Sequence, residues 1–164
     1  MDYPQIHWWQ RTIQNLAMID VISSRFLSKY LHRMDTTVLK WSRGKKSLTT
    51  MLTGVPVVVL STTGARTGKN RSIPLAGIPD GENIILVPSS FGSISYPGWY
   101  YNLRSHPQVK LDLKGQTQDY VARIANQEER QHYWQLAVHY FPGYQSYEER
   151  SAGREIPIFI LEPV

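Results

Sequence analysis

The chain has 164 residues, of which 41% are hydrophobic and 12% aromatic; this is enough for one domain with a core and too apolar for a disordered chain. It contains no cysteine, which excludes disulfides, thiolate nucleophiles, iron–sulfur clusters and cysteine-ligated zinc, and favours a cytoplasmic location. The formal net charge of +5 allows an anionic partner, and no apolar run or amino-terminal segment has the features of a membrane span or a secretory signal.

Residues 8–31 are predicted to form an amphipathic helix, since Ile19, Ile22, Phe26 and Tyr30 recur at steps of three and four residues. A basic glycine turn over residues 41–46 then interrupts the pattern. We therefore expect a helical extension and linker over residues 1–54, followed by the main domain over residues 55–164. The helix either packs on that domain or makes a peripheral contact with the inner face of the cell membrane.

The main domain reads as short strands with interrupting helices. Residues 55–60 form a continuous β-branched run, the pattern of a strand buried on both faces. The other expected strands cover residues 73–78, 83–87, 109–113, 117–124 and 156–161, and helices are expected over 97–104 and 127–140. This order predicts an α+β, mainly β fold, in which antiparallel strands form a closed or nearly closed barrel with peripheral helices.

A glycine-rich basic turn over residues 61–75 narrowly fails to be a nucleotide-binding P-loop. Gly64 and Gly68 are separated by three residues instead of four, and Asn70 stands where a P-loop has the hydroxyl that binds magnesium. The segment that follows suits an extended strand, so we predict a hairpin tip that carries Arg66, Lys69 and Arg71. Such a tip can bind a phosphate or carboxylate, or it can be a solvated basic hairpin.

The familiar catalytic constellations are largely missing. There is no Gly-x-Ser-x-Gly motif, the histidines are too scattered to share a metal, and no closely spaced carboxylates suggest an acid and base pair, so no metal site is predicted. An aromatic group, Phe141, Tyr144 and Tyr147, recurs at three-residue spacing on one possible helical face. Its members either pack a core or contact a flat ring ligand, since each tyrosine hydroxyl needs a partner or water.

Four motifs resemble, in matching order, those of the deazaflavin-dependent nitroreductase family. They are Thr62-Thr63-Gly64-x-x-Thr67-Gly68-x-x-Arg71-x-x-Pro74-Leu75, Pro97-Gly98-Trp99-Tyr100-x-Asn102-Leu103, Pro142-Gly143-Tyr144-Gln145-x-Tyr147 and Arg154-Glu155-Ile156-Pro157. The resemblance implies a split β-barrel related to flavin-mononucleotide-binding oxidoreductases, with reduced coenzyme F420 as hydride donor and FMN as the alternative cofactor.

The resemblance also implies which residues contact the coenzyme. Those expected around its phosphate and side chain are Ala65, Arg66, Thr67, Lys69, Arg71, Ser72, Ile73, Pro74, Leu75 and Ala76, with Lys69 able to reach the acidic tail. The residues expected around the rest of the coenzyme are Val87, Pro88, Ser89, Ser90, Gly98, Trp99, Tyr100, Tyr101 and Asn102, with Trp99 against the ring system.

Phe141, Tyr144 and Tyr147 would border the substrate, and Tyr144 or Tyr147 would donate a proton or bind an oxyanion. Since the coenzyme performs hydride transfer, the absence of an acid–base dyad is consistent with this reading. The chain departs from the family pattern at three positions. Relatives often carry a basic residue in place of Ala65 and Lys or Gly in place of Ser90, and members that reduce nitroimidazoles carry Tyr in place of Phe141.

We therefore predict an F420H2-dependent oxidoreductase, of the nitroreductase or quinone reductase kind, whose acceptor is a quinone, enone or nitroaromatic. The alternatives are an FMN-binding split-barrel reductase and a non-enzymatic module that binds a lipid or other hydrophobic ligand at the membrane surface. No nucleic-acid partner is expected, because the basic residues lie in two turns without a nucleic-acid-binding motif. The oligomeric state stays open.

Overall fold

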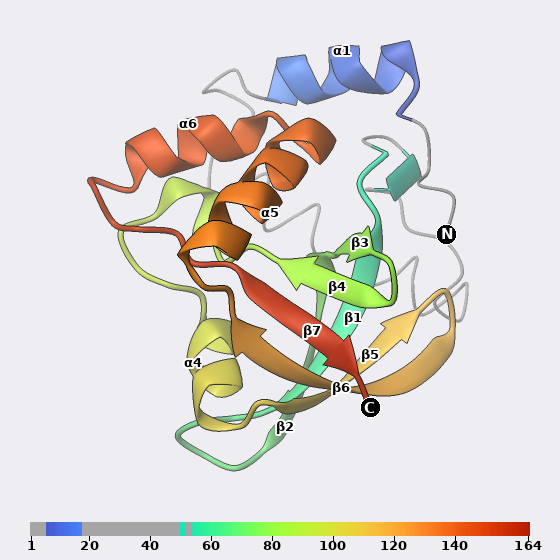
Figure 1. The fold of residues 1–164 in the computed structure, drawn as a ribbon, viewed down its shortest axis with the longest axis vertical. Coiled ribbons are helices and arrows are strands. Elements are labelled where there is room, and N and C mark those ends of the chain that lie inside the picture. Colours follow the sequence, from blue (N-terminus) through green and yellow to red (C-terminus); the bar gives the residue numbers. More distant parts are fainter. Residues whose placement is uncertain (1–5, 18–49, 52–53) are drawn as a thin grey trace.

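A single antiparallel sheet dominates the computed structural model, which describes residues 6–17, 50–51 and 54–164 (Figure 1). Its seven strands lie in the order β2-β1-β5-β6-β7-β4-β3. They are β1 (Val57–Thr63), β2 (Asn70–Ala76), β3 (Ile78–Asp80), β4 (Asn83–Leu86), β5 (Gln108–Leu113), β6 (Gln116–Ile124) and β7 (Phe159–Pro163).

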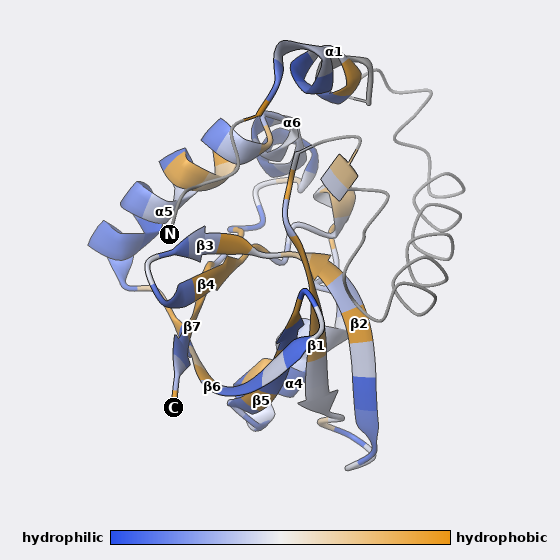
Figure 2. Ribbon diagram, turned by 90° about the vertical axis from the view of Figure 1, so that its right-hand side faces the viewer, coloured by the Kyte–Doolittle hydropathy of each residue, from blue (hydrophilic) through white to orange (hydrophobic). Residues whose placement is uncertain are grey.

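The sheet closes on itself because its two outermost strands are neighbours in sequence. Only Gly77 separates β2 from β3, so one bent segment pairs with β1 at one end of the sheet and with β4 at the other. The Gly77 N–H donates to the Pro56 carbonyl at 2.9 Å, which continues the ladder through the bend. Figure 2 shows the resulting ring of strands, and the predicted barrel is thereby confirmed.

The helices lie outside this barrel and cover part of it (Figure 1). They are α1 (Trp8–Ala17), α4 (Gly98–Ser105), α5 (Gln127–Tyr140) and α6 (Gly143–Arg150), with a short 3-10 turn, η1, over Ser90–Gly92. The helix expected over residues 8–31 is confirmed as far as Ala17; its remainder, and the linker at 41–46, lie outside the described residues. The division of the chain at residue 54 stays a prediction. None of the described helices combines the length and apolarity needed to cross a bilayer.

The expectation that the first strand is buried on both faces is wrong. Burial alternates along β1: Val58 and Leu60 are fully buried, whereas Val57 and Val59 are only half-buried. An antiparallel barrel has an inner and an outer face, and only the inner face of β1 belongs to the core cluster that fills the barrel. The strands buried on both faces are β4 and β7, whose outer sides form a second core with α5 and α6.

The last strand also begins later than expected. Ile156 and Ile158 are buried and Pro157 is half-buried, but all three are unpaired in the ladder, and β7 starts at Phe159. Pro157 has no N–H to donate, which is consistent with a start beyond it. The Ile158 carbonyl instead accepts from the Ala125 N–H at 2.9 Å.

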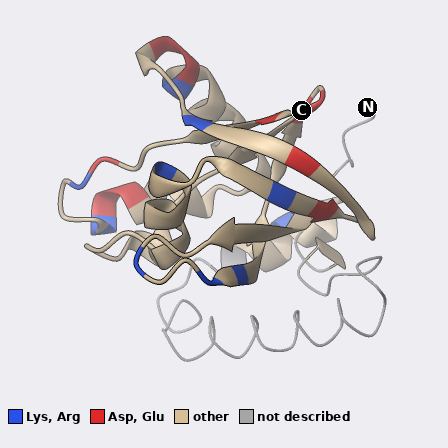
Figure 3. Ribbon diagram, turned by 90° about the horizontal axis from the view of Figure 1, so that it is seen from below, with Lys and Arg blue, Asp and Glu red and all other residues tan. Residues whose placement is uncertain are grey.

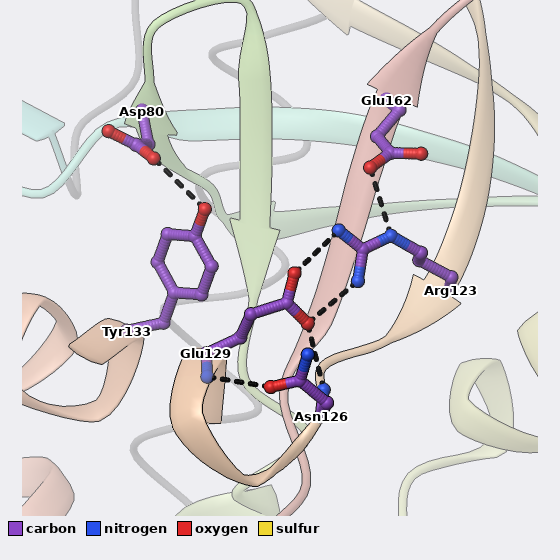
Figure 4. Close-up of polar contacts among 6 residues, drawn as sticks. All are labelled: Asp80, Arg123, Asn126, Glu129, Tyr133 and Glu162. Carbon is purple, nitrogen blue, oxygen red and sulfur yellow. Dashed lines mark hydrogen bonds and ion pairs between the residues drawn. The ribbon is translucent and has the colours of Figure 1, made fainter. Parts of the chain in front are cut away.

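Helix α5 begins with a capping box that is reinforced by an ion-pair network (Figure 4). The Asn126 side chain accepts from the Glu129 N–H at 2.9 Å, and Glu129 accepts from the Asn126 N–H at 2.8 Å. Arg123 donates to both Glu129 carboxylate oxygens, at 2.7 and 2.8 Å, and to Glu162 at 2.9 Å. The Arg123 hydrogen bonds, and then the Asn126 N–H, lower the pKa of Glu129 from 4.5 to about 2.

This lowered pKa predicts a pH dependence of stability for Glu129→Gln. Because the folded-state pKa lies below the unfolded value, the carboxylate stabilises the fold fully above about pH 4.5 and loses this effect as the pH falls toward 2. Glutamine keeps the capping-box geometry but not the charge. We therefore expect the melting temperature of Glu129→Gln to lie below that of the wild type at neutral pH, with the gap closing in acid.

Thermal unfolding followed across that pH range measures the gap. Glu128→Gln is the matched control, since Glu128 is exposed in the same turn and has no ion pair with any residue that the structure describes. A gap between Glu129→Gln and the wild type that persists unchanged at about pH 2.5 would contradict the assignment.

Candidate functional site

The basic turn joins β1 to β2 as a tight hairpin loop, as the sequence predicted. The Gly64 N–H donates to the Lys69 carbonyl at 2.9 Å, and the Gly68 N–H donates to the Gly64 carbonyl at 2.8 Å. Gly68 has a φ of 66°, in the region that favours glycine. At Gly64 a Cβ would lie 2.9 Å from Thr67 Oγ1 and 3.1 Å from the Lys69 carbonyl oxygen, so a larger residue would be crowded there. No helix follows the loop, which excludes a P-loop here.

Three cations project from this turn. Arg66, Lys69 and Arg71 are all exposed, and none forms an ion pair within the described part of the chain. The β1–β2 turn carries no acidic residue (Figure 3). The turn thus keeps its positive charge available for an anionic group.

The strand that leaves the turn contributes less to the surface. Ile73 and Leu75 pack against the core inside the barrel, and the Ser72 hydroxyl lies 2.8 Å from that of Ser61. Pro74 and Ala76 are half-buried. Of the residues expected around the phosphate, the exposed ones are therefore Arg66, Thr67, Lys69, Arg71 and Ser72.

Asn102 holds the basic turn against helix α4. Its Oδ1 accepts from the Ala65 N–H at 3.0 Å, and its Nδ2 donates to Thr62 Oγ1 at 3.0 Å. Both side-chain polar atoms are engaged and the residue is buried. Asn102 thus positions the turn, a role different from the direct coenzyme contact that the resemblance implies.

The aromatic residues of α4 divide between the core and the surface. Trp99 is 7% exposed and its ring lies 6.1 Å from that of Phe159, so it forms part of the barrel core. Tyr100 is equally buried and stacks on Tyr96 at 4.0 Å. Tyr101 is 50% exposed. Contact of Trp99 with a ring ligand stays a prediction; its buried position leaves little of the indole accessible.

The loop between β4 and α4 has an unusual backbone. Ser90, Phe91 and Gly92 all have positive φ, of 51°, 55° and 77°. A left-handed conformation costs about 1–2 kcal/mol for a residue with a Cβ, so the surroundings must impose it on Ser90 and Phe91. The loop is pressed onto α6, because a Cβ at Gly92 would lie 3.1 Å from the Tyr147 carbonyl oxygen.

Helix α6 presents the aromatic group that the sequence identified. The Phe141 ring lies 5.7 Å from Tyr144 and 6.0 Å from Tyr147, and Tyr147 lies 5.9 Å from Phe91 of the loop. Gly143 permits this packing, since a Cβ there would lie 2.3 Å from the Phe141 ring. Only Tyr144 and Tyr147 lie on α6; Phe141 precedes it as the residue that ends α5, so the single helical face predicted for all three is wrong for Phe141.

Both phenols are protonated at neutral pH. Burial raises the pKa of Tyr144 well above its usual range, and the neighbouring Tyr147 adds to the effect. Burial also raises the pKa of Tyr147, although Arg150 partly offsets the shift. Neither hydroxyl has a hydrogen-bond partner among the residues described, so each is an available donor.

These parts lie along one side of the molecule. In Figure 1, α6, the loop after β4, α4 and the β1–β2 turn follow one another from top to bottom. The fold thus brings together the basic turn, the loop and the aromatic group from three separate parts of the sequence. Among the described histidines and carboxylates, no group is arranged to hold a metal ion.

Two residues of the candidate site, Phe91 and Arg154, were not predicted from the sequence. Phe91 joins the aromatic group through its contact with Tyr147, and Arg154 bonds the carbonyls of Ser89 and Ser93. Arg154 belongs to the fourth motif, so its position was visible although its role was not. The left-handed backbone at Phe91 has no signature in a single sequence.

Comparison with known proteins identifies related chains. The model of a family described as F420H(2)-dependent quinone reductase matches residues 31–163. A Mycobacterium tuberculosis protein provisionally named F420H(2)-dependent quinone reductase Rv3178 is 31% identical over 109 residues, which cover 66% of this chain and 91% of the relative. The F420H(2)-dependent quinone reductase Rv1261c of the same organism is 29% identical, over 65% of this chain and 72% of its own.

Solved structures agree with these relatives. The F420-H2 dependent reductase FDR-A is 37% identical with a TM-score of 0.61, covering 65% of this chain and 94% of its own. A chain described as a domain-swapped dimer is 31% identical with a TM-score of 0.63, covering 82% of this chain and 98% of its own. The predicted split-barrel architecture is confirmed by these similarities.

Proposed function

The chain belongs to the F420H(2)-dependent quinone reductase family, and on that premise we propose that it transfers hydride from reduced F420 to a quinone. The observation that carries the proposal is the placement, on one side of the barrel, of a buried aromatic group and a basic turn that has no ion pair with the described residues. Family membership also favours the enzymatic prediction over a non-enzymatic ligand-binding module. Enones and nitroaromatics remain candidate acceptors of the same site.

The residues present fit an elongated, anionic coenzyme with a flat ring. Arg66 and Arg71 would bind its phosphate, and Lys69 would reach the acidic tail. Ala65 supplies no charge of its own, and its N–H is already bonded to Asn102. The coenzyme, when bound, supplies the hydride; the protein has to orient it, exclude water and provide a proton.

A tyrosine of α6 is the proposed proton donor. Reduction of a quinone to a hydroquinone takes up one hydride and one proton, and the proton ends on a quinone oxygen. The raised pKa of Tyr147 keeps its phenol protonated, and its ring contacts the loop at Phe91. Tyr144 lies deeper, between Phe141 and Trp134. We therefore assign donation to Tyr147, and packing beneath the substrate to Tyr144 and Phe141.

The direct test is a titration followed by a turnover assay. Purified full-length protein should change the deazaflavin fluorescence saturably and should oxidise reduced F420 when a soluble quinone such as menadione is added. FMN in excess is the competitor that distinguishes the two cofactors. Displacement of F420 by FMN would favour the FMN-binding reductase, and the absence of any saturable change with F420 would refute the proposal.

Exchanging Tyr147 for phenylalanine should lower kcat for quinone reduction by about a hundredfold, because it removes the proton donor while keeping the ring. The dissociation constant for F420 should stay unchanged. Tyr144→Phe should lower kcat much less. A larger loss in Tyr144→Phe would exchange the two roles, and unchanged kcat in both variants would mean that water supplies the proton.

Helix α1 is the proposed point of peripheral membrane contact. Trp8 and Trp9 are 81% and 38% exposed, and indole rings favour the membrane interface. Co-sedimentation with anionic liposomes tests the contact by comparing the wild type with Trp8→Ser/Trp9→Ser. Ile94→Ser is the control, since Ile94 is an exposed apolar residue elsewhere on the surface. Equal sedimentation of wild type and double variant would refute the contact.

A further inference from the structure

Arg154, in the segment between α6 and β7, is hydrogen-bonded to the loop between β4 and α4. Its Nε donates to the Ser93 carbonyl at 3.1 Å, and its Nη2 donates to the carbonyls of Ser89 and Ser93 at 3.0 and 2.9 Å. Its guanidinium lies 4.4 Å from the centre of the Tyr96 ring, whose hydroxyl donates to the Glu155 carbonyl at 2.9 Å. Arg154 thus fixes both ends of the turn that contains Ser90 and Phe91.

The opposite side of the turn is fixed by α6. Gly92 lies against the Tyr147 backbone, and the Gly92 N–H donates to the Ser89 carbonyl at 3.0 Å. The left-handed residues Ser90 and Phe91 are therefore held between Arg154 and α6. Without these contacts the turn would relax, because nothing in the two side chains favours a positive φ.

Two backbone donors are left available in the turn. The N–H groups of Ser90 and Phe91 form no hydrogen bond with the described residues. They follow Ser89, which has right-handed helical φ and ψ of −66° and −32°. Successive N–H groups at a change from right-handed to left-handed backbone converge on an electronegative atom. The Phe91 ring also lies 5.9 Å from that of Tyr147, which places this turn beside the aromatic group.

We propose that Arg154 is a positioning residue that aims the Ser90 and Phe91 N–H groups at a carbonyl oxygen of the deazaflavin ring. This inference rests on the proposed function, since it assumes that F420 binds on this side of the barrel. The basic turn holds the phosphate at one end, and the clamped turn receives the ring at the other. Arg154 touches no ligand; it acts through the carbonyls of Ser89 and Ser93.

The test compares Arg154→Met and Arg154→Lys with Arg130→Met. Arg130 is a matched control, because it too donates to a main-chain carbonyl, that of Ile156 at 3.2 Å, and lies over an aromatic ring, Trp134 at 5.4 Å. It does not contact the loop. Melting temperature, the dissociation constant for F420 and the amide resonances of Ser90 and Phe91 are measured for each full-length protein.

We expect both Arg154 variants to bind F420 about tenfold more weakly than the wild type, the loss associated with two neutral hydrogen bonds. Arg130→Met should melt earlier with an unchanged dissociation constant. In the wild type, F420 should shift the Ser90 and Phe91 amide resonances downfield, and in Arg154→Lys this shift should be lost. Lysine keeps the charge but lacks the planar guanidinium fork that bonds both carbonyls here, so Arg154→Lys keeps the test valid if Arg154→Met fails to fold.

Three results would overturn the inference. They are unchanged F420 affinity in Arg154→Lys, an equal loss in Arg130→Met, and amide shifts produced by inorganic phosphate alone. Lack of F420 binding by the wild type would instead refute the proposed function, on which the inference rests. The two failures are therefore distinguishable.

Discussion

With both Arg66 and Arg71 changed to glutamine, we expect the affinity for reduced F420 to fall by about two orders of magnitude. A hydrogen bond to a charged group contributes about 1.5–3 kcal/mol, and about 1.4 kcal/mol corresponds to a factor of ten in affinity. The loss of two guanidinium contacts is therefore enough to lower the affinity by about two orders of magnitude. Both side chains are exposed and unpaired with described residues, so their removal should leave the fold intact. Fluorescence titration measures the change.

The salt dependence of binding gives a second readout. Wild-type affinity should fall as the ionic strength rises, and that of Arg66→Gln/Arg71→Gln should fall less, because fewer cations contact the anion. Lys114→Gln is the matched control: it removes an exposed cation from the β5–β6 turn, at a φ of 55°. Equal affinities in the double variant and Lys114→Gln would mean that the basic turn is a solvated hairpin.

Gly77→Ala should destabilise the protein by about 2–3 kcal/mol, the effect of overpacking a core. A Cβ at Gly77 would lie 2.7 and 2.8 Å from the two methyl carbons of Val58 and 3.1 Å from Ile84 Cγ2. Val58 is fully buried, so it has no space into which to move. Since Gly77 joins β2 to β3, the steric strain of the added methyl group would act at the point where the barrel closes.

For a chain of this size the loss corresponds to a melting temperature lower by about 5–10 °C. Gly98→Ala is the matched control, because a Cβ there would meet nothing within 4 Å and alanine favours the helix that Gly98 begins. Thermal unfolding of both variants checks the prediction. A stability of Gly77→Ala equal to that of Gly98→Ala would show that the junction adapts without cost.

Much of the secondary structure could be predicted from patterns among neighbouring residues. The limits of α5 at Gln127 and Tyr140 were predicted, and the structure shows the local reasons: Asn126 and Glu129 form a capping box, and Phe141 ends the helix. The basic hairpin tip was also found from its turn residues. These features depend on residues that are close together in the sequence.

Only separate parts of the candidate site could be predicted from the sequence. The sequence identified the basic turn and the aromatic residues of α6, and the resemblance to a known family connected them to one coenzyme. It did not identify Asn102 as a buried link to Ala65 and Thr62, because nothing local distinguishes an engaged amide from a free one.

The sequence alone determined most of the segments that become strands and helices, α6 being indicated only by the spacing of its tyrosines, and which turn carries the positive charge. Only the tertiary structure decided which strands are buried on both faces. The apolar runs of β1 and β4 look alike, but α5 and α6 cover the outer side of β4 and not that of β1. The left-handed turn at Ser90 and Phe91 is likewise imposed by Arg154 and α6, which approach it from distant parts of the chain. Burial and strain depend on what packs against a segment, and that is fixed only when the chain has folded.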